Sequence, residues 1–66
     1  MKIRIDRDAD ALYIRLTERG LVESEEARPG VVLDFDASGQ VVGIEMLDIS
    51  SRMSPQEMQS LDFASA

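Results

Sequence analysis

The chain has 66 residues, the size of a single domain, and carries a net charge of −6 with no Cys and no His. A domain of this size buries only about 60% of the surface that its unfolded chain exposes. Without Cys, neither a disulfide nor a thiolate-bound metal can stabilise it further. Because self-association is the remaining common way to bury more surface, we expect a homodimer or a larger assembly.

The expected location is the cytoplasm. No apolar run approaches the roughly 18 residues of a membrane span. The first residues alternate between apolar and charged types, whereas a signal peptide has a continuous apolar run. The negative charge makes nucleic acid an unlikely partner and favours a small basic protein instead.

Residues 2–6 and 11–17 are predicted to form the first hairpin, because apolar and polar residues alternate in both segments. Pairing Ile5 with Leu12 and Ile3 with Ile14 keeps the apolar side chains on one face. This register leaves residues 7–10 as a four-residue loop, a common hairpin length. The opposite face, which we call the outer face, then carries Lys2, Arg4, Tyr13 and Arg15 from this hairpin.

Residues 31–36 and 41–48 repeat the pattern and are predicted to form a second hairpin with a loop at 37–40. Here Phe35 is expected to pair with Val42, and Leu33 with Ile44. Asp34 and Glu45 point outward where the first hairpin has Arg4 and Arg15. This reversal suggests that the two outer faces attract each other, within one chain or across a dimer. The pattern alone leaves open whether the hairpins arose by duplication.

Residues 21–27 are highly charged and are predicted to form a short edge strand, because charge protects an exposed strand from unwanted pairing. A helix is expected over residues 55–63. Ser54 is a good N-cap, Pro55 suits the first helical position, and Glu57 completes a capping box. The fold class is therefore α+β, a single domain spanning 1–66. It is an antiparallel meander of four to five short strands with one C-terminal helix packed on one face.

The composition argues against an enzyme. The chain has no His, the commonest general base, so its Ser and Thr hydroxyls have no imidazole to activate them. The main groups of carboxylates lie in turns or on the exposed strand, where nothing raises a pKa towards neutrality. We therefore expect no catalytic residue and no cofactor.

One segment has the spacing of a calcium-binding loop. Asp34, Asp36, Ser38 and Glu45 would be its ligands, with Gly39 at the glycine position. A calcium loop of this kind connects two helices, whereas the flanking residues here have strand composition. We therefore expect a hairpin turn and no bound metal.

The outer face is also expected to hold apolar residues that a single helix on the other face cannot cover. A patch of this kind on a small domain is typical of a protein interface. The candidates for self-association are Tyr13, Val32, Val41, Leu47 and Ile49.

Charge is divided unevenly along the chain. Residues 1–20 contain five basic and four acidic side chains, a net charge of +1, whereas residues 21–66 contain two basic and nine acidic ones, a net charge of −7. The acidic part is therefore expected to bind a basic partner. The candidates are Glu23, Glu25, Glu26, Asp34 and Glu45.

The stretch Ile5–Leu16, IDRDADALYIRL, resembles a family of short prokaryotic proteins known as domain of unknown function 2283. The likeness continues through PGVVLDFD at 29–36 and VGIE at 42–45. The resemblance implies no established activity. It does imply a stand-alone bacterial cytoplasmic protein, and some members are encoded beside another small protein, as in toxin–antitoxin pairs.

The hypothesis that best fits these observations is a non-catalytic, antitoxin-like interaction protein that forms a homo-oligomer. Two alternatives stay open. The acidic turns could form a ligand- or metal-binding module, or the basic stripe of Lys2, Arg4 and Arg15 could contact DNA as a β-ribbon.

Overall fold

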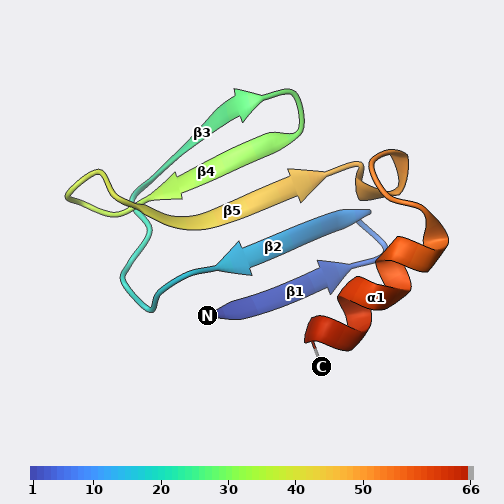
Figure 1. Ribbon diagram of the computed structural model, residues 1–66. Helices are drawn as coiled ribbons and strands as arrows, with labels where there is room; N and C mark the ends of the chain where they lie inside the picture. The colour runs from blue at the N-terminus through green and yellow to red at the C-terminus, as the bar shows by residue number, and fades with distance from the viewer. Residues whose placement is uncertain (66) are drawn as a thin grey trace.

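The computed structural model describes the backbone of residues 1–65 and the side chains of residues 1–61. Five strands are followed by a 3₁₀ turn and a helix (Figure 1). The strands are β1 (Lys2–Asp6), β2 (Ala11–Arg15), β3 (Glu23–Arg28), β4 (Val31–Phe35) and β5 (Val41–Leu47), the 3₁₀ turn is Ile49–Ser51, and the helix is α1 (Pro55–Ser65). The predicted α+β fold, an antiparallel sheet with one C-terminal helix, is confirmed.

The strands form one sheet in the order β1-β2-β5-β4-β3, and every pairing is antiparallel. Strands β3, β4 and β5 follow one another as a meander, and the β1–β2 hairpin joins this meander through β2 and β5. Local alternation of residues did not indicate this last pairing, which places Tyr13 opposite Glu45 and Ile14 opposite Ile44. The order makes β1 and β3 the two edges of the sheet.

The first hairpin has the predicted register, with Ile5 opposite Leu12 and Ile3 opposite Ile14. Strand β2 ends at Arg15, two residues earlier than predicted. The N–H of Leu16 still donates to the Val42 carbonyl at 2.9 Å, and Leu16 is 43% exposed.

Aspartates organise the loop of this hairpin. Asp6 Oδ1 accepts a hydrogen bond from the backbone N–H of Ala9 at 3.1 Å. The carboxylate of Asp10 accepts two bonds from Ser50, from the backbone N–H at 3.1 Å and from the hydroxyl at 2.7 Å. The loop is therefore tied directly to the 3₁₀ turn forty residues later.

The second hairpin differs from its predicted register at one end. Leu33 lies opposite Ile44 as expected, but Phe35 pairs with Val41 instead of Val42. The register shifts between Asp34 and Phe35, as in a β-bulge, where two residues of one strand face a single residue of the other. The extra residue, Val42, is completely buried.

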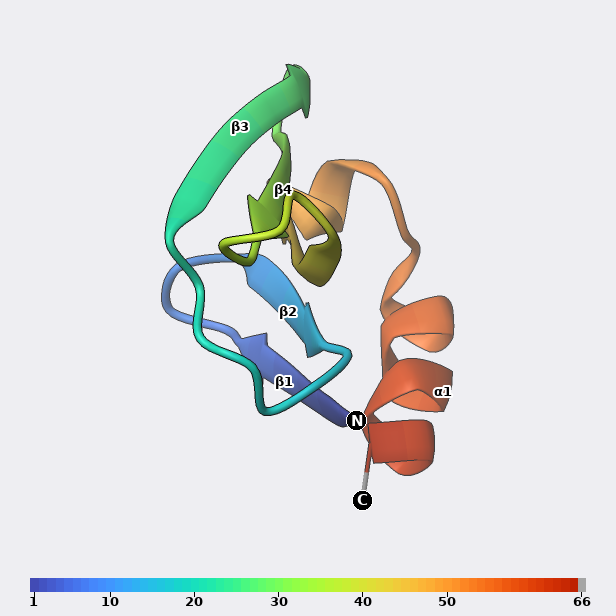
Figure 2. The same ribbon diagram turned by 90° about the vertical axis from the view of Figure 1, so that its left-hand side faces the viewer.

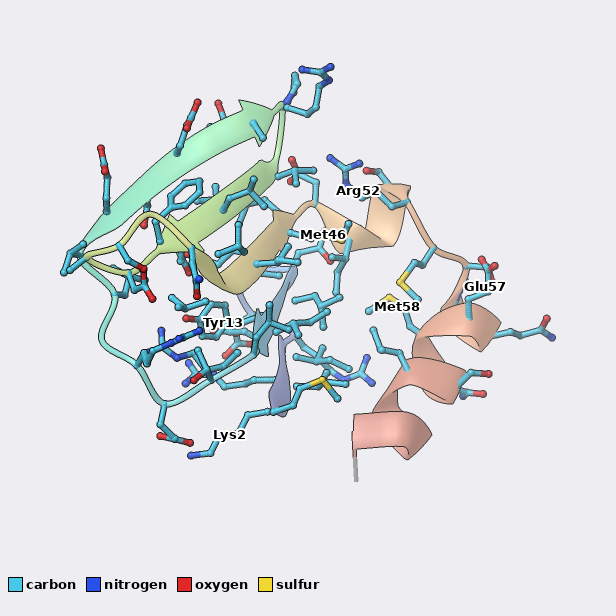
Figure 3. The ribbon with its side chains drawn as sticks, turned by 60° about the vertical axis from the view of Figure 1, so that its left-hand side comes forward. Lys2, Tyr13, Met46, Arg52, Glu57 and Met58 are labelled. Atoms are coloured by element: carbon cyan, nitrogen blue, oxygen red, sulfur yellow. The ribbon has the colours of Figure 1, made fainter. Side chains whose placement is uncertain are left out.

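Helix α1 begins with the predicted capping box. The backbone N–H of Glu57 donates to Ser54 Oγ at 3.1 Å, and the backbone N–H of Ser54 donates to Glu57 Oε1 at 2.9 Å. These bonds with Ser54 hold the pKa of Glu57 below its usual value. The helix packs against β1 and lies on one side of the sheet only (Figure 2). Met46 and Met58 lie between the sheet and the helix (Figure 3).

The best-buried apolar side chains are Leu12, Val42 and Ile49. The prediction that Ile49 belongs to an exposed patch on the outer face is wrong, because its side chain is only 1% exposed. The physical reason is the backbone of Asp48, whose φ of 53° ends the strand alternation and starts the 3₁₀ turn.

Arg52 joins the end of the 3₁₀ turn to the β3–β4 hairpin. Its Nη2 donates to the backbone carbonyl of Pro29 at 2.7 Å, and its Nε donates to that of Leu47 at 3.3 Å. Gly30, with φ of 78°, lies directly beneath the guanidinium group.

Candidate functional site

Edge strand β3 presents three exposed carboxylates, those of Glu23, Glu25 and Glu26. The strand pairs with β4 alone, so its other edge has no neighbouring strand. Because side chains alternate along a strand, Glu23 and Glu25 project towards the face of the sheet that bears α1. Glu26 projects towards the outer face. Among the described residues, none of the three forms an ion pair.

The outer face is the side of the sheet turned away from α1, where Lys2 and Tyr13 lie in Figure 3. It carries Lys2 and Arg4 from β1, Tyr13 and Arg15 from β2, Glu45 from β5, Val32 and Asp34 from β4, and Ser24 and Glu26 from β3. Its basic residues therefore belong to β1 and β2, and its acidic residues, apart from Asp6 at the end of β1, belong to the other three strands. The two hairpins lie side by side with opposite charges, as their sequences indicated.

A single row of residues crosses all five strands on this face. The registers place Arg4 opposite Tyr13, Tyr13 opposite Glu45, Glu45 opposite Val32, and Val32 opposite Glu26. Arg4 and Glu26, at the two ends, are both exposed. In the described part of the chain, Arg4 has no ion-pair partner.

Arg15 is engaged within the chain. Its Nε donates to the backbone carbonyl of Thr17 at 2.7 Å, and its Nη2 donates to that of Arg19. Its Nη1 also lies 3.4 Å from the hydroxyl of Tyr13. Arg15 therefore holds the connection between β2 and β3 against the end of the sheet. This leaves Lys2 and Arg4 as the freely exposed cations of the basic stripe, a smaller field than a DNA-binding ribbon needs.

Asp34 is fully buried, which the sequence did not indicate. Its Oδ1 accepts a 2.7 Å hydrogen bond from the hydroxyl of Ser24 on the neighbouring strand. Its Oδ2 has no donor within reach. Room for this side chain comes from Gly43, because a Cβ there would lie 3.1 Å from Asp34 Oδ2 and 3.0 Å from the Tyr13 hydroxyl. The glycine therefore lets an aromatic ring and a carboxylate approach the same stretch of β5.

Glu45 is the second carboxyl group of this cluster. Partial burial raises the pKa of Glu45 above its usual value, and a hydrogen bond and charge repulsion with Asp34 raise it further. An ionised Glu45 has no proton to donate. Only a protonated Glu45 can therefore supply the donor that the Asp34 carboxylate lacks. Asp34 and Glu45 therefore form a carboxyl pair in which the neighbouring Asp34 favours the protonated form of Glu45.

The predicted calcium-loop residues do not converge. Asp34 and Glu45 belong to the carboxyl pair, whereas Asp36 turns into its own loop. There its Oδ1 accepts bonds from the Ser38 N–H at 2.9 Å, the Ser38 hydroxyl at 2.7 Å and the Gln40 N–H at 3.0 Å. Within the described residues, no cluster of three or more acidic side chains is arranged to hold a metal ion.

The remaining self-association candidates differ in exposure. Tyr13, Val32 and Val41 are half-buried, and Leu47 is 39% exposed. A shallow hollow of about 460 Å³ lies between Leu47, Tyr13 and the loop of the first hairpin. It is open to solvent, whereas a small-molecule site usually encloses most of its ligand.

Exposed apolar side chains gather instead near the β2–β3 connection. Leu16 and Leu21 are each 43% exposed, and Val22 is 64% exposed. The connection passes on the side of the sheet away from α1 (Figure 2). Sequence analysis missed this cluster by assigning Leu16 and Leu21 to strands. The signal available was Gly20, which interrupts the apolar positions and is typical of a loop.

The chain belongs to the family described as "Protein of unknown function (DUF2283)", whose characteristic sequence matches residues 2–50. The match covers all five strands and ends at the 3₁₀ turn. Comparisons with curated proteins and with solved structures found no match. In the part of the chain that the structure describes, no helix has the length and hydrophobicity needed to cross a bilayer.

Proposed function

We propose that this protein is a non-catalytic interaction protein of the bacterial cytoplasm that associates with itself and binds a small basic protein. The partner binds the acidic edge of the sheet, in the manner of an antitoxin that neutralises its toxin. The observation that carries the proposal is the position of Glu23, Glu25 and Glu26 on an edge strand, exposed and, among the described residues, without an ion-pair partner.

The edge position supports binding in two ways. Carboxylates that form no ion pair within the described chain attract a basic surface over several ångströms and steer its approach. The outer backbone edge of β3 has no neighbouring strand and can accept one from another protein. Glu23 and Glu25 lie on the α1 side of the sheet, so a partner there leaves the outer face accessible.

The chemistry of the other carboxylates supports a non-catalytic role. The side chains of Asp6, Asp10, Asp36 and Glu57 each accept at least one hydrogen bond from a backbone N–H group, which is a structural task. Glu45 has a raised pKa, but its neighbour Asp34 is fully buried, the nearby Ser24 hydroxyl donates to Asp34, and the hollow beside Glu45 is open to solvent.

The test begins with capture of partners from a lysate of the bacterium that encodes the protein, followed by mass spectrometry. The charge-neutral variant Glu23→Gln/Glu25→Gln is compared with Asp8→Asn/Glu18→Gln, which removes the same charge from exposed positions outside β3. We expect a small basic protein to be captured by the parent and by the Asp8/Glu18 variant. The Glu23/Glu25 variant should capture much less of it.

Kinetics with the purified partner then isolate the role of charge. Complementary charges act chiefly on the association rate, so the Glu23/Glu25 variant should associate more slowly and show a flatter dependence on ionic strength. Folding stability should change by less than about 1 kcal/mol per site, since exposed carboxylates contribute little. Equal salt dependence in the two variants would contradict the proposal and make β3 a solubilising edge only.

A further inference from the structure

The ends of the row across the outer face carry opposite charges that nothing in the described chain neutralises. Arg4 lies on edge strand β1 and Glu26 on edge strand β3, with Glu45 on the central strand between them. Both end residues are exposed. Because the sheet has two strands on each side of β5, Arg4 and Glu26 each lie two strands away from Glu45. One end of the row is therefore positively charged and the other end, at the same distance from the centre, is negatively charged.

Two copies of this row can face each other in two simple symmetric orientations, and opposite charges meet in only one of them. Symmetric dimers pack the same surface of both subunits about a two-fold axis. An axis across the strands would stack Arg4 on Arg4 of the partner subunit and Glu26 on Glu26 of the partner subunit. An axis parallel to the strands reverses the strand order, so Arg4 then faces Glu26 of the partner subunit. Charge therefore selects the second orientation.

The exposed apolar cluster selects the same orientation independently. Leu16, Leu21 and Val22 lie at the end of the sheet where β2 finishes, and their connection bulges towards the outer side (Figure 2). An axis parallel to the strands brings this end of each subunit to the same end of the other, so the two apolar clusters meet. An axis across the strands would place the cluster against the charged loop at 7–10.

We infer that a second copy of this chain packs on the outer face about a two-fold axis parallel to the strands, with Arg4 of each subunit meeting Glu26 of the partner subunit. This inference rests on the self-association part of the proposed function and specifies its surface. It also divides β3 between two tasks. Glu26 binds the second copy, and Glu23 and Glu25 on the other face bind the basic partner.

The interior of the interface matches the same geometry. Tyr13 lies between Arg4 and the centre, and Val32 lies between the centre and Glu26, so Tyr13 faces Val32 of the partner subunit. Glu45 lies near the axis and faces Glu45 of the partner subunit. Because the pKa of Glu45 is raised, repulsion at that contact is relieved at a less acidic pH than it would be for an ordinary glutamate.

Charge reversal tests the contact in both directions. The variants are Arg4→Glu, Glu26→Arg and the double variant, each checked for folding by circular dichroism and studied by sedimentation over a dilution series. Arg4→Glu and Glu26→Arg should each raise the dissociation constant of the dimer by about tenfold or more at low salt. The double variant should regain most of the affinity, and an equimolar mixture of the two single variants should form heterodimers.

The matched control is Glu25→Arg, which makes the same charge change one residue away on the opposite face of β3. It should leave the dimer unchanged. If the parent dimerises but Arg4→Glu and Glu25→Arg weaken it equally, or the double variant regains nothing, the inferred surface is wrong while self-association stands. A parent that stays monomeric at all concentrations overturns both self-association and the inferred surface, and leaves partner binding through Glu23 and Glu25 intact.

Discussion

The β1–β2 and β4–β5 hairpins have the same apolar pattern but place their outward residues in different environments. Arg4 and Asp34 occupy equivalent positions in the two patterns, yet Arg4 is exposed and Asp34 is completely buried. The difference follows from strand order, since β1 is an edge and β4 lies between β3 and β5. Position in the sheet, more than residue type or local pattern, decides which outward charge reaches solvent.

The two loops show the same contrast. Asp6 and Asp36 are equivalent positions at the start of each loop. The Asp6 carboxylate accepts one hydrogen bond, from the Ala9 N–H, whereas a single oxygen of Asp36 accepts three. The other oxygen of Asp36 lies 3.4 Å from Arg19 of the β2–β3 connection. Bonds from the Ser38 hydroxyl and the Gln40 N–H, with the charge of Arg19, hold the pKa of Asp36 below its usual value. The second loop is therefore the more strongly organised one.

The largest effect that separates the hairpins should come from Asp36→Ala. It removes the acceptor for three hydrogen bonds, whereas Asp6→Ala removes the acceptor for one. We expect the loss in free energy of unfolding to be at least roughly twice as large for Asp36→Ala, because each unsatisfied donor adds its own cost. Urea unfolding of the two variants measures the ratio. Equal losses would show that the two loops are held in the same way.

A smaller effect is expected at the glycine beside Asp34. Gly43→Ala places a Cβ 3.0 Å from the Tyr13 hydroxyl and 3.1 Å from Asp34 Oδ2. The crowding should destabilise the protein by about 1–2 kcal/mol, as overpacked sites usually do. Gly20→Ala is the matched control, since its Cβ would meet nothing within 4 Å. A Gly43→Ala variant as stable as Gly20→Ala would show that Tyr13 moves aside freely.

The raised pKa of Glu45 gives the centre of the sheet a pH-dependent contribution to stability. The raised pKa of Glu45 means that the folded protein holds this proton more tightly than the unfolded chain. Its contribution to stability is complete below the usual pKa of 4.5 and is lost as pH rises through the raised value. We therefore expect the stability contributed by Glu45 to be greater at mildly acidic pH than above neutrality.

Asp34→Asn tests this assignment. The amide keeps an acceptor for Ser24 and supplies a donor for an ionised Glu45, so stability should change less between mildly acidic and neutral pH. Asp36 and Glu57 affect stability in a different, more acidic pH range. Their pKa values are lowered in the folded protein, so their contributions to stability are lost as the pH falls through those lowered values. An unchanged pH profile in Asp34→Asn would remove the carboxyl pair as its cause.

The smallest effect should come from the contact that joins the 3₁₀ turn to the β3–β4 hairpin. Arg52→Ala removes the bonds to the carbonyls of Pro29 and Leu47. Both carbonyls are near solvent, so we expect a loss of about 0.5–1 kcal/mol in the free energy of unfolding. Thermal unfolding compared with Asp10→Ala, which releases Ser50 from the first hairpin, would rank the two attachments. A loss several times larger would show that Arg52 organises the core.

Local chemistry predicted the elements well because its signals lie within a few residues. The Ser54–Glu57 capping box and the Ile5–Leu12 register both depend on short spacings, and both are present. The pairing of β2 with β5 depends on contacts between distant segments, and alternation carries no information about it. Burial of Asp34 follows from that order and was missed for the same reason.

Two further errors have local causes that sequence pattern does not reveal. The predicted pairing of Phe35 with Val42 is wrong because a bulge adds one residue to β5. A prediction from alternation assumes that the strands contain no bulge. Ile49 was placed on the outer face by parity, but parity ends at Asp48, where φ is positive. Among the surface features, the acidic charge of edge strand β3 could be predicted from its composition. The apolar cluster of Leu16, Leu21 and Val22 depends on where β2 ends.

The central claim, that opposite faces of one edge strand serve two different partners, is tested most directly by amide NMR spectra recorded across a dilution series without any partner. Dissociation should change the signals of Arg4, Tyr13 and Glu26 and of the β2–β3 connection. The signals of α1 and those dominated by the Glu23 and Glu25 side of the sheet should change much less. Changes concentrated on α1, or no changes at any concentration, would contradict the claim.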